Sequence, residues 1–165
     1  MRQIRAVTIA DLPRLAELEA VCFPATEAAK PEQFSARFAV FPECFLLLEE
    51  DGKIVGHING CVHSAPELPD ALYANPELHR PDGDYQTVFG LVVDPDYRGR
   101  GFAGLLLERF AQDSRERGCK GMVLTCKAHL VGLYERHGFV CQGVSASSHG
   151  GAQWMDMLRT FQGHL

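Results

Sequence analysis

The chain has 165 residues, 46% hydrophobic and 22% charged, which predicts one globular domain over residues 1–165 and excludes collagen-like, low-complexity and largely disordered chains. Its 16 basic and 21 acidic residues give a net charge of −5, which argues against nucleic-acid binding and favours a small cationic partner. Six cysteines without a C-x-x-C pair, and no apolar run of about 18 residues, predict a reduced, cytoplasmic protein that does not enter a membrane.

The hydrophobic pattern changes repeatedly between the period of a strand and that of a helix. In the first half of the chain it predicts a strand at 3–7, a helix at 8–21, an ordered loop at 23–31, a helix at 31–38 and hairpin strands at 45–49 and 53–62. A surface loop with one helical turn follows at 64–83. In the second half it predicts a strand at 85–93, a helix at 102–117, a strand at 121–127, a short helix at 130–137, and strands at 139–144 and 153–158. This order predicts a mixed α/β sheet with helices on both faces, whose ligands gather at the carboxyl end of the strand that reaches Val93.

A glycine-rich turn follows that strand. The run Gly99-Arg100-Gly101-Phe102-Ala103-Gly104 matches G-x-G-x-x-G, but a dinucleotide site needs these glycines directly after the strand and an acidic residue about 20 positions later. Residues 94–98 intervene here, and none of residues 117–134 is acidic. The pattern therefore favours a turn whose backbone N–H groups and helix N-terminus bind a diphosphate, with a plain helix-capping turn as the simpler alternative.

Two longer segments resemble a known family. The run Leu91-Val92-Val93-Asp94-Pro95-Asp96-Tyr97-Arg98-Gly99-Arg100-Gly101-Phe102-Ala103 resembles the acetyl-coenzyme A motif of the GNAT N-acyltransferase superfamily, and residues 129–139 resemble its later helix motif. Residues 41–43, 78–83, 131–136 and 154–156 resemble the arylalkylamine (serotonin-type) branch more narrowly. The resemblance implies a GNAT-type mixed, mostly antiparallel sheet of about seven strands, and an enzyme that moves acetyl from acetyl-CoA directly to an arylalkylamine-like or polyamine acceptor.

The same resemblance assigns roles in binding acetyl-CoA. The strand residues would pair with the pantetheine arm, an N–H near Leu91 would bind the thioester carbonyl, and Gly90 would fit a bulge. The turn at residues 99–104 and the arginines Arg98 and Arg100 would hold the diphosphate. Tyr134 matches the general acid that protonates the departing thiolate. The expected cofactor-binding residues are Leu91, Val92, Val93, Arg98, Gly99, Arg100, Gly101, Phe102, Ala103 and Gly104.

The acceptor side is expected in the loop that contains Phe23 and Glu27, joined by Trp154 through the resemblance, although Trp154 also fits a plain core position. The two histidines on the proton path of the arylalkylamine branch fall on Thr87 and Phe89, and neither side chain can act as a base.

Three other residues are candidates for deprotonating the amine through water. These are Asp84, Glu27 and His63, each of which also fits a solvated or hydrogen-bonded position. A metal site is not expected, because the histidines lack a spaced set of Cys or Asp. The alternatives are a protein N-terminal or lysine acetyltransferase and a non-catalytic CoA-binding sensor, and a homodimer could form if the final strands pair between subunits.

Overall fold

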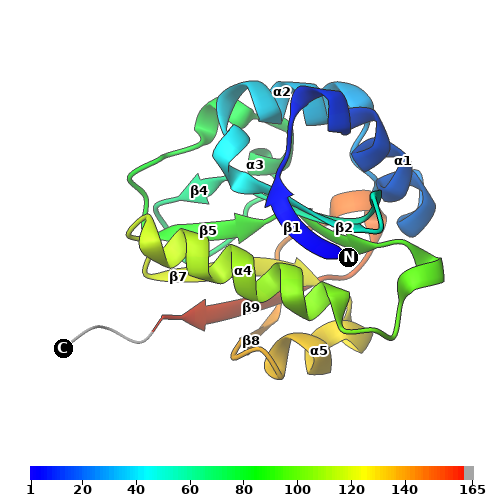
Figure 1. Cartoon of the computed structure of the whole chain (residues 1–165). Coiled ribbons are helices and arrows are strands. Elements are labelled where there is room, and N and C mark those ends of the chain that lie inside the picture. The colour runs from blue at the N-terminus through cyan, green and yellow to red at the C-terminus, as the bar shows by residue number, and fades with distance from the viewer. Residues whose placement is uncertain (162–165) are drawn as a thin grey trace. The chain divides into compact units, whose positions relative to one another are not determined.

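The computed structural model describes residues 1–161, which form a mixed α/β fold with two sheets (Figure 1). Its strands are β1 Arg2–Ala6, β2 Phe45–Glu50, β3 Lys53–Asn59, β4 Val62–His63, β5 Tyr85–Val88, β6 Gly90–Val93, β7 Gly121–Cys126, β8 Val140–Val144 and β9 Met155–Thr160. Its α-helices are α1 Leu12–Cys22, α2 Pro31–Val40, α3 Ala71–Ala74, α4 Phe102–Glu116 and α5 Val131–Glu135. Only β5 and β7 pair in parallel among the described strands, so the predicted mostly antiparallel α/β class is confirmed.

The predicted number of strands is too low because two predicted strands are each divided. The strand expected at 53–62 becomes β3 and β4. It divides at residues 60 and 61 because their hydrogen bonds go to different segments: the Gly60 N–H donates to the Cys44 carbonyl, while the Cys61 carbonyl accepts the Thr87 N–H. The strand expected at 85–93 bends at Phe89 and becomes β5 and β6. Each half thus joins a different sheet, a choice made by hydrogen-bond partners distant in sequence rather than by the local apolar pattern.

The chain divides into two compact units, and the first comprises residues 1–60 and 90–110. Its sheet has the order β1-β2-β3-β6, which makes β6 an edge strand. Helix α1 packs against β3, β6 and α2, and its Leu15 and Leu18 are almost completely buried with Phe34 of α2. Gly56 of β3 permits a close contact with Leu106 of α4, whose Cδ1 lies 3.1 Å from the position that a Cβ on residue 56 would take.

The second unit comprises residues 61–89 and 111–161 of the described chain. Its sheet has the order β4-β5-β7-β9-β8, and the apolar strand β7 is central, with Met122, Val123 and Leu124 buried. Strand β8 is an edge strand with exposed Val140 and Val144, so pairing of the final strands between subunits stays a prediction.

Local sequence explains the start of α1 and the ends of α4 and α5. Helix α1 follows a 3₁₀ turn at Ile9–Asp11, where the Thr8 N–H donates to the Asp11 carboxylate at 2.7 Å, as in a capping box. Gly118 and Gly138 have φ of +99° and +83° after α4 and α5, the left-handed conformation expected of glycine at a helix end. None of the helices within residues 1–161 combines the length and apolarity needed to span a membrane.

Candidate functional site

The glycine-rich turn lies in the first unit, between the end of β6 and the start of α4. Gly99 and Gly101 have φ of +78° and +80°, and no atom lies within 4 Å of the position of a Cβ on either residue. Side chains of L-residues disfavour this conformation, so the turn needs glycine for its backbone and not for lack of space. The Leu105 N–H makes a helical bond to the Gly101 carbonyl at 3.1 Å. The amides of residues 102–104 come before that bond, in the N-terminal turn that suits an anion.

Basic side chains gather on aromatic rings around this turn. The Arg100 guanidinium lies 4.9 Å and the Lys53 ammonium 5.4 Å from the centre of the Tyr97 ring. The Arg2 guanidinium lies 4.9 Å from the centre of the Phe102 ring. Arg98 and Arg100 are exposed, so the turn presents positive charge to solvent beside the helix N-terminus.

Asp94 fixes the path of the chain into the turn. Its carboxylate accepts the Asp96 N–H at 3.0 Å and a hydrogen bond from Arg14 at 3.2 Å, with the Lys53 ammonium at 3.7 Å. The pKa of Asp94 is lowered, first by the Asp96 N–H and then by the two cations. Arg14 also donates to the Ile54 carbonyl at 3.1 Å, so a side chain of α1 joins the ends of β3 and β6.

Strand β6 offers one free edge. It pairs with β3 on one side, with Leu91 opposite Ile58 and Val92 opposite His57, and it has no strand partner on the other side among the described residues. An extended chain with alternating donors and acceptors, such as a pantetheine arm, could therefore add to it as a strand does. The expected cofactor residues 91–93 and 98–104 thus follow one another from an open strand edge to a helix N-terminus, all within one unit.

The expected acceptor loop belongs to the same unit. Phe23 ends α1 and is half-buried, and Glu27, also half-buried, donates its N–H to the Pro24 carbonyl at 2.9 Å. The loop is held by a residue that the sequence analysis does not single out: Glu19, 5% exposed, whose Oε2 accepts the Ala29 N–H at 3.0 Å.

Glu19 also lies against the start of β6. Its Oε1 is 3.2 Å from the position that a Cβ on Gly90 would take. The sequence does contain a signal for this residue, because Glu19 falls four positions after buried Leu15, on the apolar face of the helix.

Tyr134 lies in the second unit, on the short helix α5. It is 7% exposed, and its ring meets Phe139 edge-on with 5.7 Å between ring centres. Burial raises the pKa of the Tyr134 hydroxyl far above its usual range, and nearby Cys126 and Tyr73 raise it further. The hydroxyl therefore carries its proton at neutral pH, as a proton donor must.

Trp154 belongs to a group of four rings in the second unit, which we call the aromatic group: Tyr73, Phe89, His149 and Trp154. Tyr73 stacks on His149 with 4.9 Å between centres and an interplanar angle of 8°, and it lies at the same distance from Phe89. The Trp154 Nε1–H donates to the His149 carbonyl at 2.8 Å, and the Lys127 ammonium lies 5.8 Å from the Trp154 ring.

Thr87, which the resemblance to the arylalkylamine branch places at a histidine position, is buried. Its hydroxyl donates to the Cys61 carbonyl at 2.8 Å. His63 is half-buried, and desolvation lowers its pKa. Asp84 forms an ion pair with Lys120 at 3.6 Å. Candidate bases are thus present in the second unit, but Asp84 already has a cationic partner.

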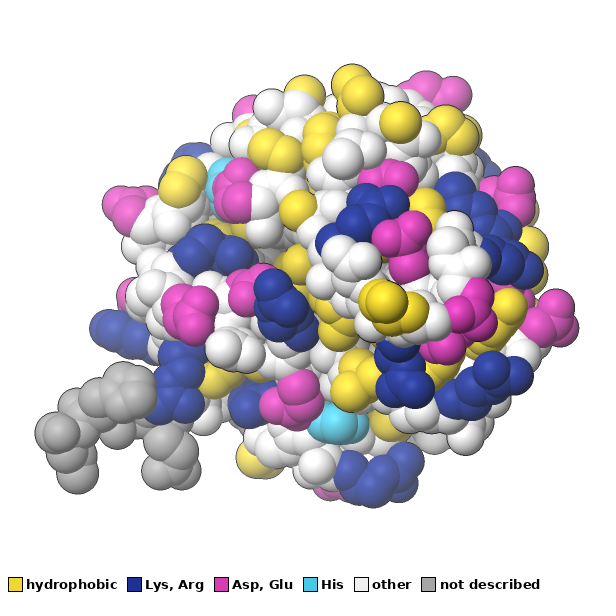
Figure 2. Space-filling model, in the orientation of Figure 1, with side chains coloured by type: hydrophobic (Ala, Val, Ile, Leu, Met, Phe, Trp, Pro, Cys, Tyr) yellow, Lys and Arg dark blue, Asp and Glu magenta, His cyan; other side chains and the backbone are white. Residues whose placement is uncertain are grey.

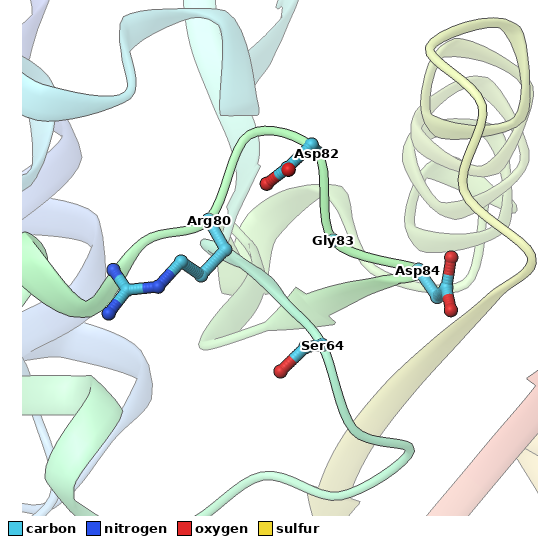
Figure 3. A pocket seen from close by; sticks show the side chains of 5 residues that line it. All are labelled: Ser64, Arg80, Asp82, Gly83 and Asp84. Carbon is cyan, nitrogen blue, oxygen red and sulfur yellow. The ribbon is translucent and has the colours of Figure 1, made fainter.

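Asp84 lines an open pocket of ≈ 260 Å³ together with Ser64, Arg80, Asp82 and Gly83. Figure 3 shows the Arg80 and Asp84 side chains extending in opposite directions from the loop. Gly83 is required there, because a Cβ would lie 2.7 Å from the His63 carbonyl oxygen. These side chains do not converge on one point, so the pocket by itself indicates no reaction.

Comparison with known proteins gives a consistent result. The model of the acetyltransferase (GNAT) family matches residues 12–139. An acetyltransferase of Yersinia pestis is 32% identical over 98 residues, which cover 58% of this chain and only 56% of that protein. A serotonin N-acetyltransferase of Mesocricetus auratus is 25% identical over 166 residues, covering 98% of this chain and 79% of that protein. The GphF GNAT-like decarboxylase, solved in complex with isobutyryl-CoA, has a TM-score of 0.82 at 23% identity and covers 96% of this chain and 98% of that chain.

Proposed function

Because the chain belongs to the acetyltransferase (GNAT) family, we propose that it transfers the acetyl group of acetyl-CoA directly to a primary amine. The observation that carries the proposal is the continuous path from the open edge of β6 through the exposed, cationic glycine turn to the N-terminus of α4. This path offers amide groups to a pantetheine arm and positive charge to a diphosphate, the two ends of one acyl-CoA molecule.

Each part of the path has a chemical task in the proposal. The amides of residues 102–104 and the guanidinium groups of Arg98 and Arg100 hold the diphosphate. Residues 91–93 pair with the pantetheine arm. The Leu91 N–H binds the thioester oxygen as negative charge develops on it, and donors of this kind contribute about 2.7–4 kcal/mol to transition-state stabilisation.

Tyr134 supplies the proton that the departing thiolate takes. The support for this role is that Tyr134 matches the tyrosine of the family motif and lies on the short helix α5 as that motif predicts. A thiolate with a pKa of about 8.5 needs a donor in place when the C–S bond breaks.

The proposed acceptor is a small arylalkylamine or a polyamine. The net charge of −5 favours an ammonium substrate, and the aromatic group offers ring faces on which an aryl side chain or an ammonium can rest. Over the face drawn in Figure 2, basic and acidic side chains are interspersed, without the extended basic area that nucleic acid requires.

The proposal is tested by measuring CoA release with a thiol reagent at saturating acetyl-CoA. The acceptors are tryptamine, phenethylamine, spermidine, an amino-terminal peptide and a lysine peptide, each compared with the rate of hydrolysis without an amine. Turnover of the small amines supports the proposal, and turnover of peptides alone points to a protein acetyltransferase. Acetyl-CoA binding with no turnover of any acceptor contradicts the proposal and indicates a CoA-binding sensor.

A further inference from the structure

The proposed function leaves open which group removes a proton from the ammonium substrate. We infer that Glu19 is this base, and the inference rests on the proposed function. Its carboxylate is nine-tenths buried and lies between the two parts of the first unit that the function requires. One oxygen holds the acceptor loop through the Ala29 N–H, and the other faces Gly90, next to the expected thioester-binding amide of Leu91.

Asn59 supplies a second observation beside Gly90. A Cβ on Gly90 would lie 3.2 Å from Glu19 Oε1 and 3.9 Å from Asn59 Nδ2, so the lack of a side chain lets both polar groups approach the start of β6. Asn59 is 1% exposed, and its Nδ2 has no hydrogen-bond partner among the described residues, while its Oδ1 accepts from Arg37 at 3.3 Å. A buried donor without a partner is unfavourable, and a ligand oxygen that accepted from it would remove this penalty.

The reaction balances with Glu19 in this role. The carboxylate takes one proton from R–NH₃⁺, and the neutral nitrogen attacks the thioester carbon, so that a C–N bond forms and the C–S bond breaks. The thiolate takes a proton from Tyr134, which regains one from the acetylated nitrogen, and Glu19 later releases its proton to solvent. A base is needed because an alkylamine with a pKa of about 10 is almost completely protonated at neutral pH.

Ionisable groups on α1, α2, β3 and the segment after β6 lie in the same part of the first unit as Glu19. From α2, Arg37 contributes a positive charge near Asn59. From β3, His57 is completely buried with its pKa lowered to about 3, so it is neutral. In α1 itself, desolvation raises the pKa of the half-buried Cys22 thiol, and Arg98 after β6 interacts with it. The remaining carboxylate of the acceptor loop, Glu27, is half-buried.

The test is the pH profile of kcat/KM for tryptamine and phenethylamine in Glu19→Gln, with Glu17→Gln as the control. Glu17 lies on the same helix, is 65% exposed and pairs with Arg14, and the expected result for this control is wild-type activity. For Glu19→Gln we expect a loss of about 100-fold at pH 7. The loss should shrink about tenfold per pH unit up to pH 9, because the variant can use only amine that is already neutral.

Two outcomes overturn the inference, and they are distinguishable. A loss in Glu19→Gln that is the same at every pH shows that Glu19 only supports the loop, and a wild-type profile in that variant shows that it has no role. In both cases the proposed function stands. If the wild-type protein turns over none of the small amines, the proposed function fails and the inference fails with it. Thermal unfolding and acetyl-CoA titration of the variant establish that it is folded, and Glu19→Asp, which keeps the carboxylate, should restore the wild-type shape of the profile.

Discussion

Replacing Gly101 with alanine tests whether the conformation of the glycine turn matters for binding acetyl-CoA. The φ of +80° is unfavourable for alanine by about 1–2 kcal/mol, and because nothing lies within 4 Å of the new Cβ, no steric clash adds to this value. Residues 99–101 are exposed, so we expect the alanine variant to relax in the free protein and to require the left-handed conformation again when the diphosphate binds. The strain then weakens acetyl-CoA binding by about 5- to 30-fold.

The assay is calorimetric titration with acetyl-CoA, combined with urea unfolding of the same samples. Gly143→Ala is the matched control, because Gly143 has φ of +107°, equally open space and a position on β8 away from the expected cofactor residues. The control should lose about 1–2 kcal/mol of unfolding free energy and keep the wild-type affinity. If Gly101→Ala binds acetyl-CoA within twofold of the wild type, the diphosphate does not depend on this turn conformation and the proposed cofactor path is wrong.

Two further variants test the chemistry and the buried polar groups. Tyr134→Phe should lower kcat about 100-fold or more while the Kd for acetyl-CoA stays unchanged, and an unaltered kcat would remove Tyr134 from the mechanism. His57 has a folded pKa of about 3 against 6.5 when unfolded, so its stabilising contribution is complete above pH 6.5 and is lost as pH falls toward 3. Urea unfolding should show a decline of about 1.4 kcal/mol per pH unit below pH 6.5, and this component should disappear in His57→Gln. An identical slope in the two proteins would contradict this assignment.

Local sequence was sufficient for features that depend on neighbouring residues. Gly101 and Gly118 stand where the backbone needs a positive φ, and Asp51-Gly52 forms the predicted hairpin turn with φ of +51° and +82°. The apolar run of β7 predicts a strand buried on both faces, and Met122 to Leu124 are buried. In each case a backbone preference or a short hydrophobic period acts over a few residues, so no distant partner is required.

The sequence alone determined the mixed α/β class, the glycine turn and the family, because these depend on local patterns and on two contiguous motifs. Only the tertiary structure decided where two predicted strands divide, since the partners of residues 60, 61 and 87 come from other segments. It also decided the neighbours of Glu19. The helical period places this carboxylate on a buried face, but its position beside Gly90, which lies 71 residues later, follows from the packing of α1 on β6. A buried carboxylate is stable only where hydrogen-bond donors reach it, and the Ala29 N–H reaches Glu19 only when the chain is folded.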